Sequence, residues 1–387
     1  MGKYNFEDVL DRRGTACQKW DLAESEGYPE DILPMWVADM DFAVMPEITE
    51  ALVRRIQDHP IYGYSVTVPG HDEAVCSWMK RRHGWDAKPE WIVSTPGVVC
   101  AFKTAVQCFT EPGEAVMLQK PVYYPMIKGI EDNGRKLVNN ALVNINGHYE
   151  IDFEDFEKKI VENDVKLFIL CSPHNPVGRV WTKEELTRMG DICLKYHVIM
   201  VVDEIHEDFV FAPNKFLPFL SLKKEYEEIA VVCTAPSKTF NVAGLKFSSI
   251  FIPNPELRNR FYRHLVCCGV NNNNMVGSTA SKTAYELGDE YVDELVEAIK
   301  SNVDFFRDYL AEKLPMLKMI EPEGLYLVWV DVSAFGLEDE ELKNFMIYDA
   351  KVWLDEGYIF GPEGHNFERF NLAHSKAQIK EAIDRIR

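Results

Sequence analysis

Short apolar runs alternate with amphipathic stretches through the middle of the chain. Apolar runs of this length are typical of buried strands, and the stretches between them have helical spacing, as at residues 98–108 and 182–196. Thr182 and Glu185 form a capping-box pattern at the start of the second helix. Strands that are apolar throughout and separated by helices form parallel sheets covered on both faces, so the pattern predicts an α/β fold with a mostly parallel sheet. The predicted strands are 115–118, 136–143, 167–171, 198–202, 229–233 and 248–252.

The pattern changes after about residue 286. A long helical pattern at 291–314 leads to a short strand at 326–330, then to a further helix and a final strand near Arg369. This order predicts a smaller α+β domain at the C-terminal side. No repeat or flexible linker interrupts the chain, so we expect the domains to pack closely. The expected division is an N-terminal segment, 1–44, packing on the small domain; a large domain, 45–285; and the small domain, 286–387.

Composition and charge restrict the class of protein. The 387 residues are 47% hydrophobic and 27% charged, which is ordinary for a globular protein. The 62 acidic residues exceed the 42 lysines and arginines and give a net charge of −20, which disfavours a nucleic-acid partner. Residues 1–13 lack the apolar core of a signal peptide, and no apolar run could span a membrane. With nine cysteines and no CxxC pair, we expect a cytoplasmic protein with reduced thiols and no membrane partner.

Candidate chemistry follows the predicted strands, because ligands of parallel sheets bind at the carboxyl ends of strands. Asp203 ends an apolar strand, where a buried carboxylate is costly unless it meets a cation, so we expect it to face a cationic ligand. A metal site of Asp203, His206 and Asp208 is the alternative, but no further cluster with ligand spacing supports it and we expect no metal. Glu204, Glu207 and Asp208 are expected to form a solvated rim.

Three further segments follow predicted strands. Residues 171–178, Cys-Ser-Pro-His-Asn-Pro-Val-Gly, form a rigid turn that either holds Asn175 towards a ligand or is purely structural. Lys238 lies among small hydroxyl residues, where a desolvated amine could form a Schiff base. The helix that starts at Gly97 offers N–H groups to a phosphate. In the small domain, Arg369 could bind a substrate carboxylate, although a surface salt bridge is the commoner role of an arginine.

Together these segments resemble the fold type I pyridoxal-phosphate (PLP) enzymes of the class I/II aminotransferase superfamily, over nearly the whole chain. A closer resemblance is carried by Phe6 with Asp11-Arg-Arg-Gly-Thr15, Lys19-Trp-Asp21, Leu33-Pro-Met-Trp-Val-Ala-Asp-Met-Asp-Phe42, Tyr62-Gly-Tyr-Ser65, Arg82-His-Gly-Trp85 and Ser172-Pro-His-Asn-Pro-Val-Gly-Arg-Val-Trp181. In these motifs the chain is most similar to the cystathionine β-lyase subgroup, the MalY/PatB-like C–S lyases. This resemblance implies a mostly parallel seven-stranded sheet sandwiched by helices, with a smaller α+β C-terminal domain.

The resemblance implies PLP as the cofactor and assigns roles around its ring. Lys238 is the lysine that forms the Schiff base, and Asp203 pairs with the pyridinium nitrogen and keeps it protonated. Tyr123 stacks on the ring and is the third catalytic residue, while its neighbour Tyr124 is assigned to packing. Asn175 hydrogen-bonds the ring oxygen O3′. His206 replaces a tyrosine that contacts the same oxygen in many relatives, and it could equally be a core histidine.

The cofactor phosphate is expected to bind the backbone N–H groups of Gly97, Val98 and Val99 and the hydroxyl of Ser237. Two positions depart from many aminotransferases. Ala235 replaces a serine or threonine and removes one hydroxyl, and Lys246 replaces an arginine and keeps only its positive charge. Tyr64 resembles a tyrosine that reaches the phosphate of the partner subunit, so a homodimer with shared active sites is implied.

The substrate side rests on the same resemblance. Arg369 matches the arginine that binds the α-carboxylate of the substrate, and Asn175 contributes beside it. Trp36 and Asp39 are expected to border the substrate cleft. The following segment, Ala373-His-Ser-Lys376, departs from the Cys-Pro-Arg sequence common in the subgroup.

The expected reaction is β-elimination from a small sulfur amino acid such as L-cystathionine or L-cysteine, which releases pyruvate, ammonia and a thiol. Lys238 would remove the proton from Cα. A PLP-dependent aminotransferase, which acts on an amino acid and a 2-oxo acid, uses the same residues and is the alternative. A regulatory protein that retains the enzyme fold is disfavoured, because the lysine, acid, asparagine and arginine positions are all filled.

Overall fold

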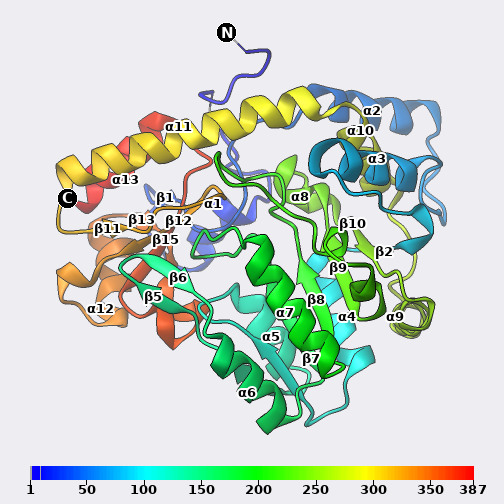
Figure 1. The fold of residues 1–387 in the computed structure, drawn as a ribbon. Helices are drawn as coiled ribbons and strands as arrows, with labels where there is room; N and C mark the ends of the chain where they lie inside the picture. The colour runs from blue at the N-terminus through cyan, green and yellow to red at the C-terminus, as the bar shows by residue number, and fades with distance from the viewer. Residues whose placement is uncertain (1, 9) are drawn as a thin grey trace.

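The computed structural model describes residues 2–8 and 10–387, and a seven-stranded sheet lies at its centre (Figure 1). Six strands run parallel, and only β10 is antiparallel to its two neighbours. The predicted mostly parallel α/β sheet is therefore confirmed. In spatial order the strands are β2 (Ile92–Thr95), β10 (Ser248–Phe251), β9 (Ala230–Thr234), β8 (Ile199–Asp203), β7 (Leu167–Cys171), β3 (Ala115–Leu118) and β4 (Lys136–Asn139).

One predicted strand is wrong in extent. The segment expected as a single strand over 136–143 ends as β4 at Asn139, and the chain then forms a separate hairpin of β5 (Val143–Ile145) and β6 (His148–Glu150). The residues of β5 are exposed, whereas Val138 of β4 is buried. Apolar residues resume at Ala141, Leu142 and Val143 directly after Asn139 and Asn140, so the pattern does not show where the chain leaves the sheet.

Helices cover both faces of this sheet. On one face, α4 (Val98–Phe109), α5 (Tyr124–Glu131) and α9 (Pro255–Cys267) pack on one set of strand side chains. On the other, α6 (Phe153–Asn163) and α7 (Lys183–Lys195) pack on the alternate set. The expected capping box starts α7: the Glu185 N–H donates to the Thr182 hydroxyl over 3.1 Å, and the Thr182 N–H donates to the Glu185 carboxylate over 2.8 Å.

The C-terminal part forms an α+β unit, as expected. A 25-residue helix, α11 (Asp289–Lys313), follows α10 (Met275–Leu287) and packs against α13 (Lys376–Ile386). Beneath them lies an antiparallel four-stranded sheet, and α12 (Asp339–Asn344) lies in the connection between two of its strands (Figure 1). Its order is β11 (Lys318–Met319), β12 (Leu327–Asp331), β15 (Phe367–Asn371) and β14 (Asp355–Glu356).

The N-terminal segment lies against this C-terminal unit. After α1 (Gln18–Ser25), β1 (Leu33–Pro34) pairs in parallel with β13 (Val352–Trp353). Two later helices, α2 (Pro46–Asp58) and α3 (His71–His83), pack on α10. The domain boundaries near residues 44 and 285 stay a prediction. Among the described residues, no helix combines the length and apolar character needed to cross a bilayer.

Candidate active site

The carboxyl ends of four strands border a cavity of about 180 Å³. Asp203 ends β8 and lies in register with Cys171, the last residue of β7. Gly97 follows β2, and Lys238 follows β9 within the short helix α8 (Pro236–Thr239). The structure thus brings together residues that are far apart in sequence. Apart from Tyr64, every residue expected to contact the cofactor lines this cavity: Gly97, Val98, Val99, Tyr123, Asn175, Asp203, His206, Ser237, Lys238 and Lys246.

The amine of Lys238 is held inside this cavity. Its Nζ donates a hydrogen bond of 2.7 Å to the carbonyl oxygen of Ala38. Burial lowers the pKa of Lys238 to about 8, and the positive charge of Arg369 adds to this shift, against the opposing effect of Asp39. A substantial fraction of neutral amine is therefore present near physiological pH, as a nucleophile or a base requires.

Asp203 is a buried carboxylate that needs a cation. It is 4% exposed, and its Oδ1 accepts a hydrogen bond of 3.1 Å from the N–H of Ile205. Burial raises the pKa of Asp203 to about 7, against the Ile205 N–H and the charge of Lys238. Within the described chain no lysine or arginine nitrogen comes within 4.0 Å of this carboxylate. A protonated pyridine nitrogen is the type of group that would compensate it, so the acid fits PLP.

The lining around Gly97 suits a phosphate. Gly97 precedes α4 with φ of +109°, and a Cβ at this position would meet no atom within 4 Å. The first N–H groups of α4 therefore start beside open space, and the helix dipole favours an anion there. Ser237 and Lys246 line the same cavity and add a hydroxyl and a positive charge. This set of donors fits the phosphate of PLP.

Tyr123, Asn175 and His206 also line the cavity. The N–H of Tyr123 donates to the carbonyl of Asn175 over 3.1 Å, and burial raises the pKa of the Tyr123 hydroxyl, which keeps it protonated. His206 is 3% exposed, and burial lowers its pKa well below the ordinary value, so the ring is neutral. Its Nδ1 has no hydrogen-bond partner within the described chain. The cavity-lining position leaves both expected roles of His206 open.

Arg369 lies behind the cavity lining rather than in it. It is 1% exposed, so the alternative of a surface salt bridge is wrong. Nη1 donates to Oδ1 of Asn175 over 3.0 Å, and Nη2 donates to the carbonyl of Trp36 over 2.8 Å and to Oδ2 of Asp355. Burial raises the pKa of Asp355, although Arg369 opposes the shift. Sequence reasoning missed Asp355, yet it follows the apolar run Val352–Leu354, the same signal that identified Asp203.

Trp36 and Asp39 have different surroundings. The Trp36 ring stacks on Trp353 at a centroid distance of 4.4 Å, so only its carbonyl oxygen contacts Arg369. Asp39 lines a second cavity, of about 950 Å³, that shares Lys238 and Lys246 with the first. The Asp39 side chain therefore borders the larger space beside Lys238, whereas the Trp36 side chain is turned away from it.

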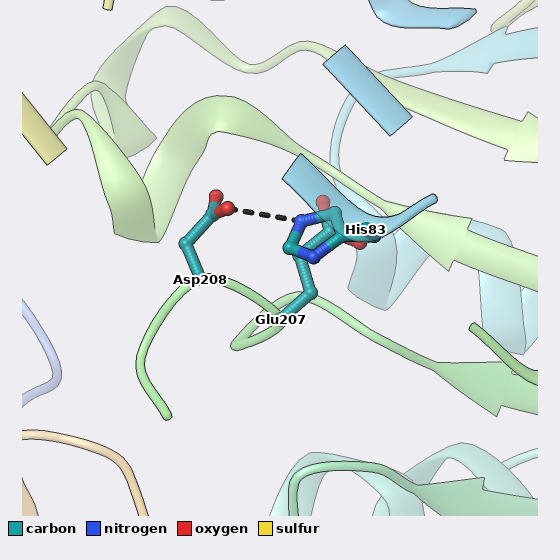
Figure 2. A group of neighbouring side chains, drawn as sticks. All are labelled: His83, Glu207 and Asp208. Atoms are coloured by element: carbon teal, nitrogen blue, oxygen red, sulfur yellow. Dashed lines mark hydrogen bonds and ion pairs between the residues drawn. The ribbon is translucent and has the colours of Figure 1, made fainter. Parts of the chain in front are cut away.

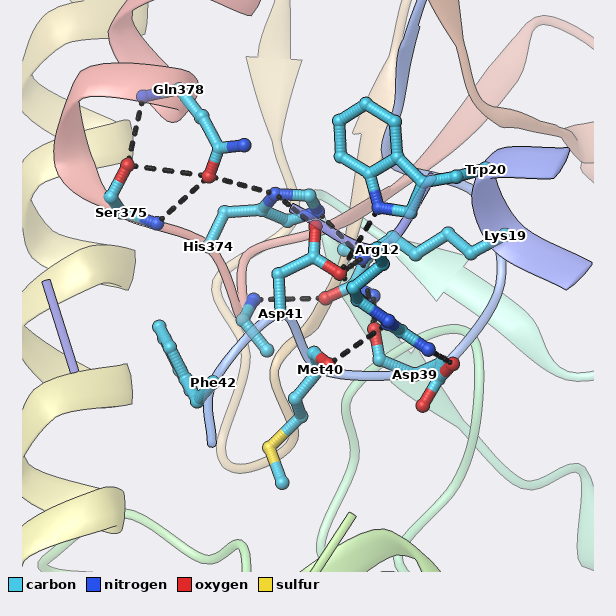
Figure 3. A network of polar contacts seen from close by, with 12 residues as sticks. Arg12, Lys19, Trp20, Asp39, Met40, Asp41, Phe42, His374, Ser375 and Gln378 are labelled. Atoms are coloured by element: carbon cyan, nitrogen blue, oxygen red, sulfur yellow. Dashed lines mark hydrogen bonds and ion pairs between the residues drawn. The ribbon is translucent and has the colours of Figure 1, made fainter. Parts of the chain in front are cut away.

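A buried ionic network fixes the segment that contains these two residues (Figure 3). Lys19, which is fully buried, donates to the carbonyl of Asp39 over 2.9 Å and lies 3.3 Å from Asp41. Arg12 binds the carboxylates of both Asp39 and Asp41, over 2.5 and 2.8 Å. His374 completes the network 2.9 Å from the Lys19 amine, and burial lowers the pKa of His374 to about 3, so it is neutral. Sequence reasoning quoted Arg12, Lys19 and Asp41 in motifs but gave them no role.

The network also explains the unusual segment at 373–376. His374 contacts Lys19, and Ser375 caps α13 by accepting from the N–H of Gln378. The residues that depart from the subgroup's sequence, His374 and Ser375, thus make polar contacts that hold the segment after β15 in place.

The three acids after Asp203 are not a solvated rim. Glu204, Glu207 and Asp208 are 0%, 2% and 7% exposed, so this expectation is wrong. Two of these carboxylates accept hydrogen bonds from buried donors. The N–H of Phe219 donates to Glu204 over 2.8 Å, and the hydroxyl of Thr234 donates to Glu207 over 2.6 Å.

The metal alternative is not supported in the form expected. Asp208 lies with His83 and Glu207, with ligand atoms within 4.8 Å of one another, and is not grouped with Asp203 and His206 (Figure 2). His83 Nε2 lies 3.1 Å from one Asp208 oxygen, and the Thr239 hydroxyl donates to the other over 2.7 Å. These contacts account for the Asp208 carboxylate without an ion.

Tyr64 is the expected cofactor-binding residue that lies outside the cavity of the single chain. It is fully exposed, in the irregular segment between α2 and α3. Its neighbours Ile61 and Val66 are also largely exposed, at 76% and 80%.

Comparison with known proteins identifies the class to which this fold and site belong. Residues 30–386 match the family "Aminotransferase class I and II", so the chain belongs to this family. Among its relatives, cystathionine β-lyase PatB of Bacillus subtilis is 44% identical over 383 residues, which cover 99% of each chain. Protein MalY of Escherichia coli is 30% identical, over 98% of this chain and 97% of its own. The predicted family and its cystathionine β-lyase subgroup are confirmed.

Solved structures agree. Cystalysin of Treponema denticola, which contains PLP, superposes with a TM-score of 0.95 at 36% identity, over 99% of this chain and 97% of its own. The PLP-bound C–S lyase of Staphylococcus hominis gives 0.92 at 31% identity, over the same shares of the two chains. The fold expected from the resemblance is confirmed.

Proposed function

We propose that this protein is a PLP-dependent C–S β-lyase, which converts a sulfur amino acid to pyruvate, ammonia and a thiol. One observation carries the proposal: the buried amine of Lys238 and the buried carboxylate of Asp203 line one small cavity that opens onto the N-terminus of α4. The names of cystathionine β-lyase PatB and of the C–S lyase of Staphylococcus hominis support the same reaction class, and cystalysin contains the same cofactor.

The residues that line the cavity would each contact a different part of PLP. Asp203 would hold the ring nitrogen, Asn175 the ring oxygen and Tyr123 the ring face. The N–H groups at Gly97, Val98 and Val99, the Ser237 hydroxyl and the Lys246 amine would hold the phosphate, and the Gly97 N–H, which donates to the Ser248 hydroxyl over 3.2 Å, would have to be shared or exchanged. When bound, PLP supplies an electron sink that stabilises negative charge at Cα of the amino acid.

The chain itself binds the substrate and moves the proton. Arg369 binds the α-carboxylate and so fixes which Cα bond faces Lys238. The neutral amine of Lys238 accepts the Cα proton at Nζ, because its lowered pKa suits a base near neutral pH. The C–S bond then breaks with its electron pair leaving on sulfur, and a proton makes the free thiol. Water supplies the carbonyl oxygen of pyruvate, and the amino nitrogen leaves as ammonia. Asp39, in the larger adjoining space, borders the side from which the sulfur substituent enters.

We also propose that the active unit is a homodimer with shared sites. The segment that holds Tyr64 exposes Ile61, Tyr62 and Val66 as well, and a second copy would cover this apolar surface. Tyr64 would then reach the phosphate in the partner subunit. Nine free cysteines are consistent with a reducing, cytoplasmic location. The pairing of β1 with β13 supports a small domain made of residues 1–44 and 286–387.

The deciding experiment is incubation of the purified holoenzyme with L-cystathionine and no 2-oxo acid. A β-lyase forms pyruvate and homocysteine in equal amounts, turnover after turnover. An absolute requirement for a 2-oxo acid acceptor would identify the aminotransferase alternative and overturn the proposal. Activity should be lost in Lys238→Ala and kept in the control Lys158→Ala, whose side chain is 66% exposed.

A further inference from the structure

Arg369 forms an ion pair with an acid on the neighbouring strand. Asp355 lies directly opposite Arg369 on the neighbouring antiparallel strand, and the two side chains are 6% and 2% exposed. Nη2 of Arg369 donates both to Oδ2 of Asp355 and to the carbonyl oxygen of Trp36. The Phe360 ring lies 4.9 Å from the guanidinium carbon and fixes its plane.

The three nitrogens of the Arg369 guanidinium make different numbers of hydrogen bonds. Nη1 makes one hydrogen bond, to Asn175, and Nε has no partner within the described residues. An arginine binds a carboxylate with two parallel hydrogen bonds either through Nη1 and Nη2 or through Nε and Nη2. Both arrangements need a hydrogen of Nη2, and the two that it carries point to Trp36 and Asp355.

We infer that Asp355 is a positioning residue that neutralises Arg369 in the free enzyme and is exchanged for the carboxylate of the substrate. Trp36 offers only a backbone carbonyl that β1 and β15 hold in place, whereas Asp355 is a side chain that can rotate. This inference rests on the proposed role of Arg369. Because every carboxylate ligand must displace Asp355, Asp355 weakens the binding of all of them. Only ligands that make further contacts in the site then bind well, so the site becomes selective.

A purely structural ion pair is the competing explanation. A structural pair would make the protein less stable when Asp355 is changed, with no gain in affinity for a carboxylate. An exchanging pair predicts tighter binding, because the variant replaces a charged acceptor of Nη2 by a weaker, neutral amide oxygen and leaves a positive charge that the ligand compensates. Glu356 provides a matched control, since it is the adjacent carboxylate and its side chain points to the opposite face of the strand.

The test compares holoenzyme of the wild type, Asp355→Asn and Glu356→Gln. The probe is 3-(methylthio)propionate, a thioether carboxylate without the amino group needed for turnover, titrated by calorimetry. We expect Asp355→Asn to bind it about tenfold more tightly, a change of about 1.4 kcal/mol, and Glu356→Gln to bind it like the wild type. With L-cystathionine, KM should fall in Asp355→Asn while kcat stays nearly constant. Equal or weaker probe binding by Asp355→Asn overturns the inference.

A second measurement serves if Asp355→Asn does not fold. In a crystal structure of the wild-type holoenzyme soaked with the same probe, the ligand carboxylate should occupy Arg369 and the Asp355 side chain should leave hydrogen-bond distance of Nη2. An unmoved Asp355 beside a bound probe contradicts the exchange. Failure of the wild type to release pyruvate would instead overturn the proposed lyase function, and the calorimetric and crystallographic results on the carboxylate probe would still decide the role of Asp355.

Discussion

The amine of Lys238 donates its hydrogen bond to the backbone carbonyl of Ala38, 200 residues earlier in the chain. The carbonyl groups next to Ala38 are bound in the same way: Trp36 accepts from Arg369, and Val37 and Asp39 accept from Asn371. Residues 36–39 therefore form a strap whose carbonyl oxygens hold the side chains of the site from both the central and the C-terminal sheets.

The state of the Lys238 amine should be visible in how fast the apoenzyme takes up PLP. Only the neutral amine attacks the aldehyde, so the rate of Schiff-base formation should rise with pH, reach half its maximum near pH 8 and level off above about pH 9. Stopped-flow absorbance of the bound cofactor measures this rate. The Lys238→Ala protein should show no such absorbance change, and a midpoint near pH 10.5, the ordinary value for lysine, would contradict the lowered pKa.

Asp203 should make the cofactor-free protein less stable as the pH rises. The folded-state pKa of Asp203, about 7, lies above its ordinary value of 3.8. Protonated Asp203 therefore stabilises the folded state fully below about pH 4, and this stabilisation is lost as the pH rises to 7. The loss is about 4 kcal/mol from this group. Urea unfolding of apoprotein between pH 4 and 8 measures it as the difference between the wild type and Asp203→Asn. A difference that does not depend on pH would show that Asp203 ionises normally.

Shared active sites predict complementation between two defective proteins. Lys238→Ala lacks the base, and Tyr64→Ala lacks the contact offered to the partner subunit. In a mixed dimer one site carries both defects and the other carries neither, so random reassortment should restore about a quarter of the sites. Activity is measured after mild denaturation and refolding of the mixture. Unmixed variants treated alike are the controls, and a mixture no more active than their average would argue against sharing.

The ionic network around Lys19 should dominate the stability of the N-terminal segment. Lys19→Met leaves Asp41 buried with fewer cationic partners and should cost about 3–5 kcal/mol of unfolding free energy. Lys351→Met removes an exposed pair with Asp31 and should cost less than about 1 kcal/mol. Chemical denaturation of the two variants gives both values. Similar losses in both would mean that Arg12 and His374 compensate the Asp41 charge without Lys19.

Much of the central sheet was predictable because β3, β7, β8 and β9 are almost entirely apolar, and residues that can carry chemistry lie at or just after their carboxyl ends. Asp203 and Lys238 stood out for that reason, and the structure places both at the same cavity. The direction of β10 was not predictable, because an apolar run has the same pattern in both directions. Glu204, Glu207 and Asp208 were misjudged, since their burial depends on partners such as His83 and Thr234 that the local sequence does not reveal.

Asp355 shows a different limit. The position of Asp355 after an apolar run is visible in the sequence. Its contact with Arg369 depends on the register between β14 and β15, which places the two residues opposite each other. Register across strands separated by a loop is fixed by tertiary packing and not by the local pattern. Lys19 and Asp41 are similar, because the residue that links them to the C-terminal unit, His374, lies 355 positions after Lys19.

The strap at residues 36–39 has a consequence for biosynthesis. Its carbonyl groups leave the ribosome early, whereas Arg369 and Asn371, which bind them, are translated more than 300 residues later. All strands of the central sheet lie before Ile252, so the sheet can form while synthesis continues. The substrate end of the pocket cannot be assembled at that stage, so a nascent chain can acquire its cofactor-binding sheet before it acquires the capacity to recognise an amino acid.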